Sequence, residues 1–486
     1  MTRSATPTRV TLGTLAGVVG FLAFVEFTSG VLQGYYTPML TDIARHLGIH
    51  DADVNWLEGT QLMLSALVVP AFAKLGDMIG HKRMLLISTA VTAAASLVLP
   101  FTDSFAVFLV GWALMGFYVV WLPLEIALIW SRARQLPGRS TITARASGML
   151  VAALESGAIV GALAGGALVD ALPLWLVLLV PSIMIVVCFF VVLFGVTESP
   201  EPTGGTFDTV GVVLVSLALI AFTGGLSLLR LNGPADALSW TVTALGLLLL
   251  VPFVLWELRC ADPLIDVRMF RSPALGPVFL TAGLFGVSVL GAQAPLSTFA
   301  RTDPAVYGYG LGTTGFATSL IIGVYLVAMI VGALLYPQFA RRITPRLTLV
   351  VAAVLVGVGF LLFLPLHSSY LQVITNMVIV GVGSGALVAA LPAAAASAAP
   401  PTQTGVATGL TNSVKTVGGA IASCVFGIAL LSHVADADAT AGSFTGYVTV
   451  WVVCGVTALA AAVLLLFVPK QAFSDRPASM DLEPVV

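Results

Sequence analysis

The segment Lys74–Arg83 reads KLGDMIGHKR and joins two long apolar stretches, residues 54–74 and 84–101. Its two glycines permit a tight turn, and Lys82 and Arg83 place two positive charges directly after that turn. A helix of about 20 mostly apolar residues crosses the roughly 30 Å of hydrocarbon in a bilayer. The segment therefore predicts a short polar turn between two membrane-spanning helices.

The chain as a whole has the composition that such a membrane protein needs. Of its 486 residues, 58% are hydrophobic and 9% are charged, whereas soluble domains carry about 25% charged residues. Helices that close their own backbone hydrogen bonds can expose apolar faces to lipid. We expect an all-α, polytopic protein of the cell membrane, a monomer surrounded by the lipid bilayer. The net charge of −2 argues against a nucleic-acid partner, which needs a basic surface.

The same length criterion, applied outward along the chain, predicts fourteen transmembrane helices. A twelve-helix alternative would omit the pair between residues 209 and 257. The predicted spans are residues 12–38, 54–74, 84–101, 105–130, 144–170, 174–196, 209–229, 239–257, 273–299, 311–336, 347–366, 370–396, 404–432 and 446–468.

Two polar breaks divide these helices into groups. The breaks are Thr197–Thr206, which is rich in proline and glycine, and Arg259–Pro273. Duplicated helix groups around a central insert are typical of transporters built from repeats. We therefore expect an N-terminal six-helix bundle (1–196), a linker with two extra transmembrane helices (197–272), a C-terminal six-helix bundle (273–470) and a cytoplasmic tail (471–486).

The basic residues predict the orientation in the membrane. An even number of spans puts both termini on one side. Of the 21 lysines and arginines, only Arg45, Arg230 and Arg301 fall on the other side and Lys415 lies inside a span. Because cytoplasmic loops carry the excess of positive charge, both termini are expected in the cytoplasm.

The Lys74–Arg83 segment resembles the loop signature of the major facilitator superfamily, which runs Gly-x-Leu-x-Asp-Arg-x-Gly-Arg-basic. The matching residues are Asp77, Gly80, Lys82 and Arg83, whereas Ala73 and Met78 replace a glycine and an arginine. An acidic residue at a helix end can hold a basic group or a helix dipole in one conformation and release it in another. The resemblance implies that these four matching residues take part in gating. The plain alternative is a solvated turn whose positive charges set the topology.

Further along, the chain resembles the fourteen-span drug:proton antiporters of that superfamily. Trp56 and Pro70 on the second span, and the pattern Asn412-x-x-Lys415-x-x-Gly418-Gly419 on the thirteenth, carry this resemblance. It implies proton-coupled efflux of an amphipathic small molecule such as a drug or antibiotic.

The chain also departs from the family pattern. Trp112 stands where the family has an arginine, and Ala162 where it has a proline. An importer, a symporter or a facilitator with the same fold therefore remains as the alternative.

The ladder of Gly157, Gly161 and Gly165 has two interpretations. Small residues at every fourth position let two helix backbones approach closely. The same face can also be the hinge on which the two halves of a transporter rock, so we predict a gating role together with close packing.

Four charged residues stand out well inside the apolar spans: Glu26, Glu125, Glu155 and Lys415. Burying an ionised side chain is costly, so such a group normally faces a cavity or a partner. A carboxyl in an apolar pocket can hold a proton near neutral pH. We predict that the three glutamates couple proton exchange to transport. The alternatives are a structural ion pair with Lys415 and, for Glu125, solvation near the cytoplasmic headgroups.

Polar and aromatic residues at helical spacing extend these charges into stripes. Such stripes indicate the walls of one shared, water-accessible cavity near the bilayer midplane, where transporters of this kind bind substrate. The predicted substrate-binding residues are Gln33, Tyr36, Gln61, Tyr118, Trp121, Gln293, Asn412 and Lys415.

Catalysis has little support in the sequence. The four cysteines show no metal-ligand spacing, the histidines fall in or beside predicted loops, and no nucleotide-binding motif is present. We expect no metal, no cofactor and no catalytic residue, and the remote alternative is a membrane-embedded enzyme. The substrate's charge stays open, because acidic and aromatic walls suit a cation and Lys415 suits an anion or a zwitterion.

Overall fold

A computed structural model describes residues 12–133, 139–198, 206–399, 404–432 and 439–468 of the chain. Every regular element within these ranges is helical. The N-terminal segment before α1, the middle of the predicted linker and the predicted cytoplasmic tail lie outside the described residues.

The elements of the first part of the chain are α1 (Leu12–Tyr35), η1 (Thr37–Met39), α2 (Leu40–Leu47), η2 (Asp51–Asp53), α3 (Val54–Ile79), α4 (His81–Val98), η3 (Leu99–Phe101), α5 (Phe105–Met115), η4 (Gly116–Val120), α6 (Trp121–Ala133), α7 (Arg139–Ala171) and α8 (Leu174–Gly195). Then follow α9 (Thr209–Asn232), α10 (Ala237–Glu257) and η5 (Val267–Arg271). The last part contains α11 (Gly276–Phe285), η6 (Gly286–Leu290), α12 (Gln293–Arg301), α13 (Pro304–Tyr307), α14 (Gly315–Arg342), α15 (Pro345–Leu361), α16 (Tyr370–Ala398), α17 (Thr404–Leu431) and α18 (Phe444–Phe467).

The predicted all-α membrane fold is confirmed. Among the described residues, 13 helical stretches are long and apolar enough to cross a membrane, and the shorter apolar helix α15 occupies the position of the eleventh predicted span, residues 347–366. The helix ends differ from the prediction in places. The first helical stretch continues to Leu47, and the fourth is interrupted by η4 between α5 and α6.

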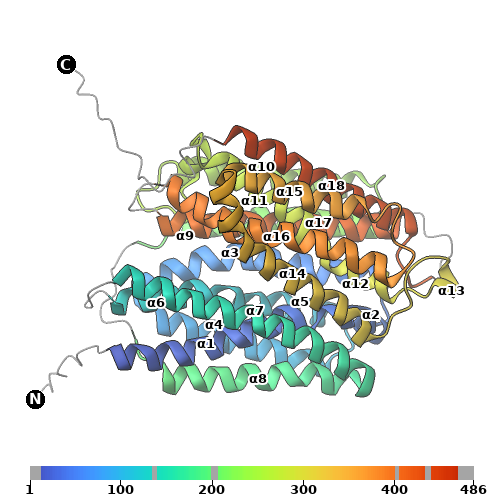
Figure 1. Cartoon of the computed structure of the whole chain (residues 1–486), viewed down its shortest axis with the longest axis horizontal. Helices are drawn as coiled ribbons and strands as arrows, with labels where there is room; N and C mark the ends of the chain where they lie inside the picture. Colours follow the sequence, from blue (N-terminus) through green and yellow to red (C-terminus); the bar gives the residue numbers. More distant parts are fainter. Residues whose placement is uncertain (1–11, 134–138, 199–205, 400–403, 433–438, 469–486) are drawn as a thin grey trace, which may run out of the picture.

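The helices pack as two groups, which we call the first half (α1–α8) and the second half (α11–α18). In Figure 1 the first half, blue to teal, lies below the second half, which is mostly orange and red. Helices α3 and α7 of the first half pack against α17 and α14 of the second half. The hairpin of α9 and α10 packs mainly on itself and touches α3 and α17 through α9.

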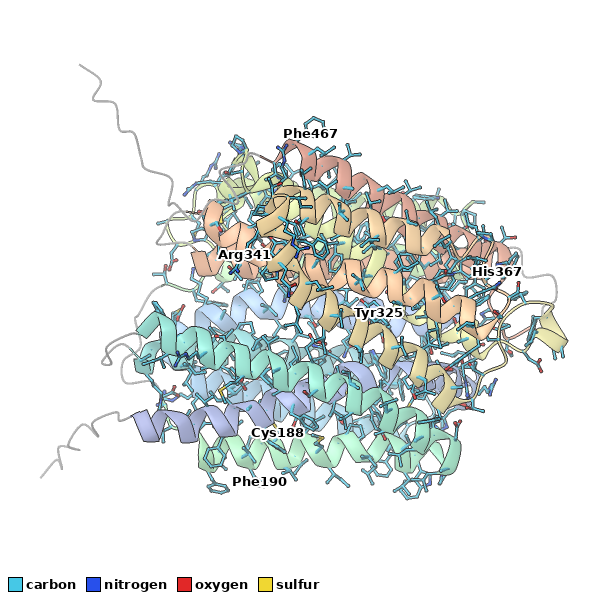
Figure 2. All side chains as sticks on the ribbon, in the orientation of Figure 1. Cys188, Phe190, Tyr325, Arg341, His367 and Phe467 are labelled. Atoms are coloured by element: carbon cyan, nitrogen blue, oxygen red, sulfur yellow. The ribbon has the colours of Figure 1, made fainter. Side chains whose placement is uncertain are left out.

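The outer faces of the helices are apolar. Phe190 on α8 is 49% exposed and points away from the molecule, as does Phe467 at the end of α18, whereas Cys188 is fully buried (Figure 2). Exposed large hydrophobic residues also follow one another along α10. Such surfaces suit contact with lipid, which needs no polar cover.

The glycine ladder of α7 brings two helices into close contact. A Cβ atom added at Gly157 would lie 2.1 Å from the backbone oxygen of Phe27, and one at Gly165 would lie 2.1 Å from that of Tyr35. Gly161 meets Val31 in the same way. Small residues are therefore required where α7 packs along α1, as the packing interpretation predicts. The predicted hinge role of the ladder stays a prediction.

Candidate transport site and gates

Two carboxyl groups lie in the core of the first half. Glu26 on α1 and Glu125 on α6 are each 0% exposed, and their side-chain oxygens have no hydrogen-bond partner among the described residues. They are close enough for their charges to act on each other. The alternative in which Glu125 is solvated near the headgroups is therefore wrong, because α6 turns this side chain into the bundle.

Two aromatic residues, from η4 and α6, lie in the same part of the first half as this acidic pair. Tyr118 and Trp121 are buried, and their rings meet edge to face with centroids 6.2 Å apart. Tyr118 also interacts electrostatically with Glu26 and with Glu58, which is half-buried one turn into α3. The structure therefore brings Glu26, Glu125, Tyr118 and Trp121 together, and it adds Glu58, which was not among the predicted site residues.

Tyr36 lies in an aromatic cluster of the first half. Its ring centroid is 5.0 Å from that of Trp112, and its hydroxyl donates to Met115 Sδ at 3.9 Å. Trp112 in turn stacks on Phe108. The position at which the resembled family carries an arginine is thus filled by a buried indole packed in an aromatic group.

A second polar site lies in the second half, between α11, α16 and α17. A cavity of about 20 Å³ is lined by the polar residues Thr411, Asn412 and Lys415 of α17. Apolar walls come from residues that include Phe285 of α11 and Leu391 of α16. The structure therefore brings Asn412 and Lys415 together, as predicted.

Glu155 lies on α7, half-buried, and interacts electrostatically with Lys415 of α17. The two side chains form no ion pair within 4 Å in the described part of the chain. The predicted alternative of a structural ion pair is therefore not seen for Glu155, and the interaction joins the first half to the second half only at longer range.

The other predicted polar residues occupy different environments. Gln33 is exposed, whereas Gln61 and Gln293 are half-buried. None of the three lines the cavity beside Lys415. The expectation of one shared cavity therefore differs from the structure, which has an acidic cluster in the first half and a basic pocket in the second half. Helical spacing identifies a polar face but does not say which neighbouring helix covers it.

The predicted gating turn has a specific partner at the end of α8. Gly80 adopts φ +114°, a backbone conformation that favours glycine. The carboxylate of Glu198 accepts hydrogen bonds from the backbone amides of Lys82 (2.9 Å) and Arg83 (3.1 Å), the first turn of α4. An anion at a helix N-terminus is stabilising. Asp77 pairs with His81 at 3.1 Å.

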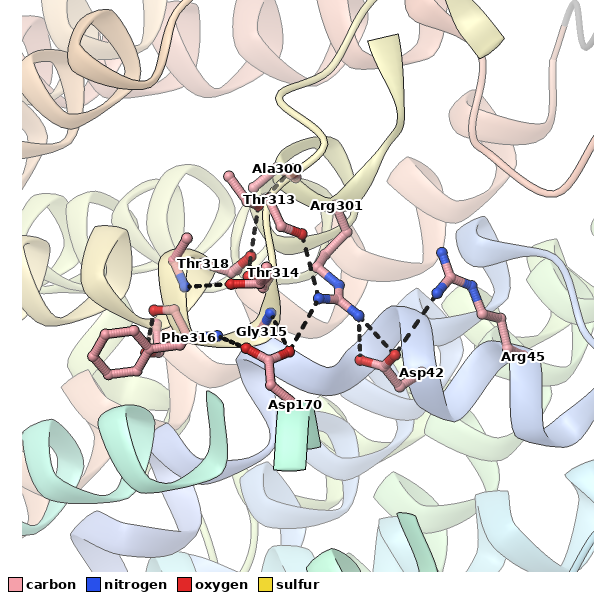
Figure 3. Close-up of polar contacts among 12 residues, drawn as sticks. Asp42, Arg45, Asp170, Ala300, Arg301, Thr313, Thr314, Gly315, Phe316 and Thr318 are labelled. Atoms are coloured by element: carbon pink, nitrogen blue, oxygen red, sulfur yellow. Dashed lines mark hydrogen bonds and ion pairs between the residues drawn. The ribbon is translucent and has the colours of Figure 1, made fainter. Parts of the chain in front are cut away.

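At the opposite end of the molecule, charged residues join the two halves (Figure 3). The guanidinium of Arg301, at the end of α12, donates to both carboxylate oxygens of Asp42 on α2, at 2.7 and 2.8 Å. It also lies 3.9 Å from Asp170 at the end of α7. Asp170 accepts from the backbone amides of Gly315 and Phe316 at 2.8 Å each. We call this group the Arg301 latch.

The two ends of the molecule are unequal. Hydrogen bonds and ion pairs between the first and second halves, within the described ranges, gather at the end with the Arg301 latch, including those of Ser297 with Thr37 and of Asp51 with Thr440. The end with Gly80 shows none between these two groups of helices in those ranges. There, Lys74 instead pairs with Asp262 after α10, at 3.0 Å. Figure 1 shows α1 starting and α18 finishing at this second end.

Sequence reasoning did not identify the latch or Glu198. The signal for the latch was present, since Arg301 is one of three basic residues on the predicted outer side, Asp42 follows the first predicted span and Asp170 ends the fifth. Residues 42 and 301 are far apart in the chain, so their pairing needed the structure. Among the described residues, no group of histidine, cysteine and acidic residues could hold a metal ion.

The sequence matches the Major Facilitator Superfamily over residues 22–423 and 284–485. It is similar to the cephamycin export protein CmcT of Amycolatopsis lactamdurans, with 29% identity across 99% of this chain and 97% of that protein. It is also similar to the tetracenomycin C resistance and export protein of Streptomyces glaucescens, with 26% identity across 79% of this chain and 70% of that protein. The multidrug efflux pump LfrA of Mycolicibacterium smegmatis is 28% identical across 70% of this chain and 67% of its own length.

Solved transporters share the fold. The peptide transporter POT, in complex with sulfate, has a TM-score of 0.68 and 15% identity, and covers 96% of this chain and 97% of its own. A variant of the nucleoside transporter NupG has a TM-score of 0.66 and 13% identity, and covers 92% of this chain and 99% of its own. The predicted family resemblance is confirmed, and with it the prediction of a transporter rather than an enzyme. The protein is a multi-pass membrane transporter of small molecules and belongs to the Major Facilitator Superfamily.

Proposed function

We propose that this transporter exports an amphipathic small molecule, such as a drug or antibiotic, in exchange for protons. The similarity to export and resistance proteins along most of the chain supports the direction of transport. One structural observation carries the proton coupling: Glu26 and Glu125 are fully buried and have no hydrogen-bond partner among the described residues.

The physical argument concerns the cost of an unpaired buried charge. An ionised carboxylate without a partner is strongly disfavoured in an apolar core. Two adjacent carboxyls disfavour double ionisation further. Loss of a proton from this pair therefore favours a conformation that admits water or a cationic partner. The protonation state of the pair thus decides which conformation is favoured, and the conformation decides whether the pair holds its proton. This mutual dependence is the coupling that an antiporter needs.

We infer that the Gly80 end faces the cytoplasm, together with both termini, in the plasma membrane. The excess of basic residues at that end supports this orientation. Because the Arg301 latch closes the other end, the structure then corresponds to a conformation closed toward the outside. Asp77, Gly80, Lys82 and Arg83 would move when the cytoplasmic end closes, and Gly157, Gly161 and Gly165 would let α7 slide along α1.

The remaining predicted residues have places in this proposal. Substrate would lie between the halves, against Asn412 and Lys415 on one side and against Gln33 of α1 and Gln61 of α3 on the other. Gln293 of α12 and the aromatic residues Tyr36, Tyr118 and Trp121 would shape the cavity as it opens. Glu155 is the third predicted coupling carboxyl, and its charge acts on Lys415. The unit of function in this proposal is the monomer, with its two six-helix bundles and the α9–α10 insert.

Vesicle transport tests the proposal. A resistance screen in a pump-deficient host supplies the test compound, and its uptake is then measured in proteoliposomes under proton gradients of either sign. Uphill uptake should occur only toward the acidic compartment. Glu26→Gln and Glu125→Gln should lose uphill transport while retaining downhill exchange, and Asp103→Asn, a control in an exposed loop, should behave as the wild type.

The opposite outcomes decide between the proposal and its rival. Uphill transport by both glutamine variants at the wild-type rate would refute the coupling role of the pair. Uptake that follows only the compound's own gradient would favour a facilitator. The buried Trp112, in the position where the antiporters have an arginine, is the observation that favours a facilitator.

A further inference from the structure

Resting on this proposed function, we infer that the pocket at Lys415 binds the carboxylate of the transported molecule, so that the substrate is an amphipathic organic anion or zwitterion. The residues that line the pocket carry one positive charge and no negative charge. A group bound there must accept hydrogen bonds on one side and be apolar where it contacts the other walls.

The donors lie on one helix face. Lys415 follows Asn412 by three residues and Thr411 by four, so the three side chains share a face of α17. An ammonium offers three donors, and an amide offers two donors beside its carbonyl. In the described part of the chain, neither the Lys415 ammonium nor the Asn412 side-chain amide has a hydrogen-bond partner. Two unused donors one turn apart match the two oxygens of a carboxylate.

Close packing fixes the helix backbone that carries these donors. A Cβ atom added at Gly286 would lie 1.9 Å from the backbone oxygen of Lys415, and one at Gly418 would lie 2.1 Å from that of Gly283. Helix α17 is therefore held at close range against the α11–η6 region. Because the backbone is already in place, only the side chains must become ordered when a ligand binds.

The size and the walls of the pocket define the rest of the ligand. A cavity of about 20 Å³ holds one small polar group, since a water needs roughly 10–15 Å³ by the same kind of measure. The walls formed by Phe285, Leu391 and Pro392 are apolar. A carboxylate on an apolar body therefore fits better than a free inorganic anion, which would need donors on every side.

The charge of Glu155 predicts the direction of a measurable change in ligand affinity. This carboxylate stabilises the Lys415 ammonium and repels a bound carboxylate. A bound carboxylate can replace Glu155 as the partner of the ammonium, so neutralising Glu155 removes the repulsion and should strengthen the binding of a carboxylate ligand, whereas a role in packing alone predicts no gain.

Three probes that share one dansyl group test the inference with the full-length protein in nanodiscs: dansylglycine (carboxylate), dansylglycinamide (neutral) and dansylcadaverine (cation). Their binding is followed by dansyl fluorescence. The wild type should bind dansylglycine about tenfold more tightly than dansylglycinamide, the change expected for one hydrogen-bonded charge pair. Lys415→Gln should abolish this preference, Lys415→Arg should largely keep it, and Glu155→Gln should tighten dansylglycine binding.

Two further variants keep the test independent of folding defects. Asn412→Asp leaves Lys415 in place but adds a competing carboxylate, and should also abolish the preference. Arg259→Gln removes an exposed charge near the end of α10 and should bind as the wild type. Equal or tighter binding of dansylglycinamide or dansylcadaverine by the wild type, or a preference that survives Lys415→Gln, would overturn the inference.

The same probes separate this inference from the exporter proposal. A carboxylate preference without proton-driven uphill uptake in vesicles would support the pocket and refute the antiport. Proton-driven uptake with no preference for the carboxylate would support the antiport and refute the assignment of the pocket.

Discussion

Replacing Arg301 with glutamine should open the end of the protein that the Arg301 latch holds closed. The Arg301 and Asp42 side chains are 10% and 21% exposed, so water screens their two hydrogen bonds only in part. A hydrogen bond to a charged group contributes about 1.5–3 kcal/mol. With Asp42 free to rehydrate in the variant, we take about 2 kcal/mol for the loss, which shifts the balance of closed and open states about thirtyfold.

Cysteine accessibility measures that shift. Gln293→Cys, on α12 inside the latch, is introduced where the four native cysteines have been replaced. An impermeant thiol reagent is then added from the outside of right-side-out vesicles. Labelling should be slow with the latch intact and roughly tenfold or more faster with Arg301→Gln. Arg301→Lys should fall between them, because an ammonium can hold Asp42 but cannot also reach Asp170 and the Thr313 carbonyl oxygen as the second guanidinium nitrogen does.

A control at the opposite end completes the design. Arg341→Gln removes an exposed positive charge at the end of α14 and should leave the labelling rate unchanged. Equal rates with and without Arg301 would refute the reasoning that this network holds the two halves together.

Other perturbations follow from single contacts. Gly157→Ala should lower the apparent Tm in detergent, by a loss of about 1–3 kcal/mol from overpacking against α1, whereas Gly148→Ala on the same helix, with nothing within 4 Å, should not. Glu198→Ala should remove the cap of α4, costing about 0.5–2 kcal/mol, and should speed limited proteolysis at the Gly80 turn; an unchanged cleavage rate would exclude that cap. The hydrogen bond from Lys74 lowers the pKa of Asp262, so its stabilisation is present above the ordinary aspartate pKa and is lost as pH falls through the lowered value. The stability advantage of the wild type over Asp262→Asn should therefore close below about pH 4, and an advantage that is constant from pH 3 to 7 would contradict it.

The fold could be predicted because membrane-spanning helices can be recognised from short stretches of sequence. Runs of about 20 apolar residues, the polar turn at residues 74–83 and the bias of basic residues all lie within short windows of sequence. The close packing of α7 against another helix was also predictable, since the spacing of its glycine ladder alone indicates it. The break at η4 was missed, although Gly116 within it and Pro123 just after it both disfavour a regular helix there.

The sites were only partly predictable. Periodicity selected Glu26, Glu125 and Lys415 as charged residues inside spans, but it could not show that the first two share a cluster while Lys415 lines a separate pocket. Those relations depend on how helices distant in sequence pack together. Glu198 was missed because its surroundings, Thr197 to Thr206, are those of a linker, and its role depends on the amides of another helix.

Proton release on substrate binding tests the central claim most directly. The purified protein in weakly buffered detergent solution is mixed with the compound found by the resistance screen, and the pH is followed. The account predicts that binding releases protons, and that the double variant Glu26→Gln with Glu125→Gln binds the compound without releasing them. Binding by the wild type without any proton release, or a release of equal size from the double variant, would contradict it.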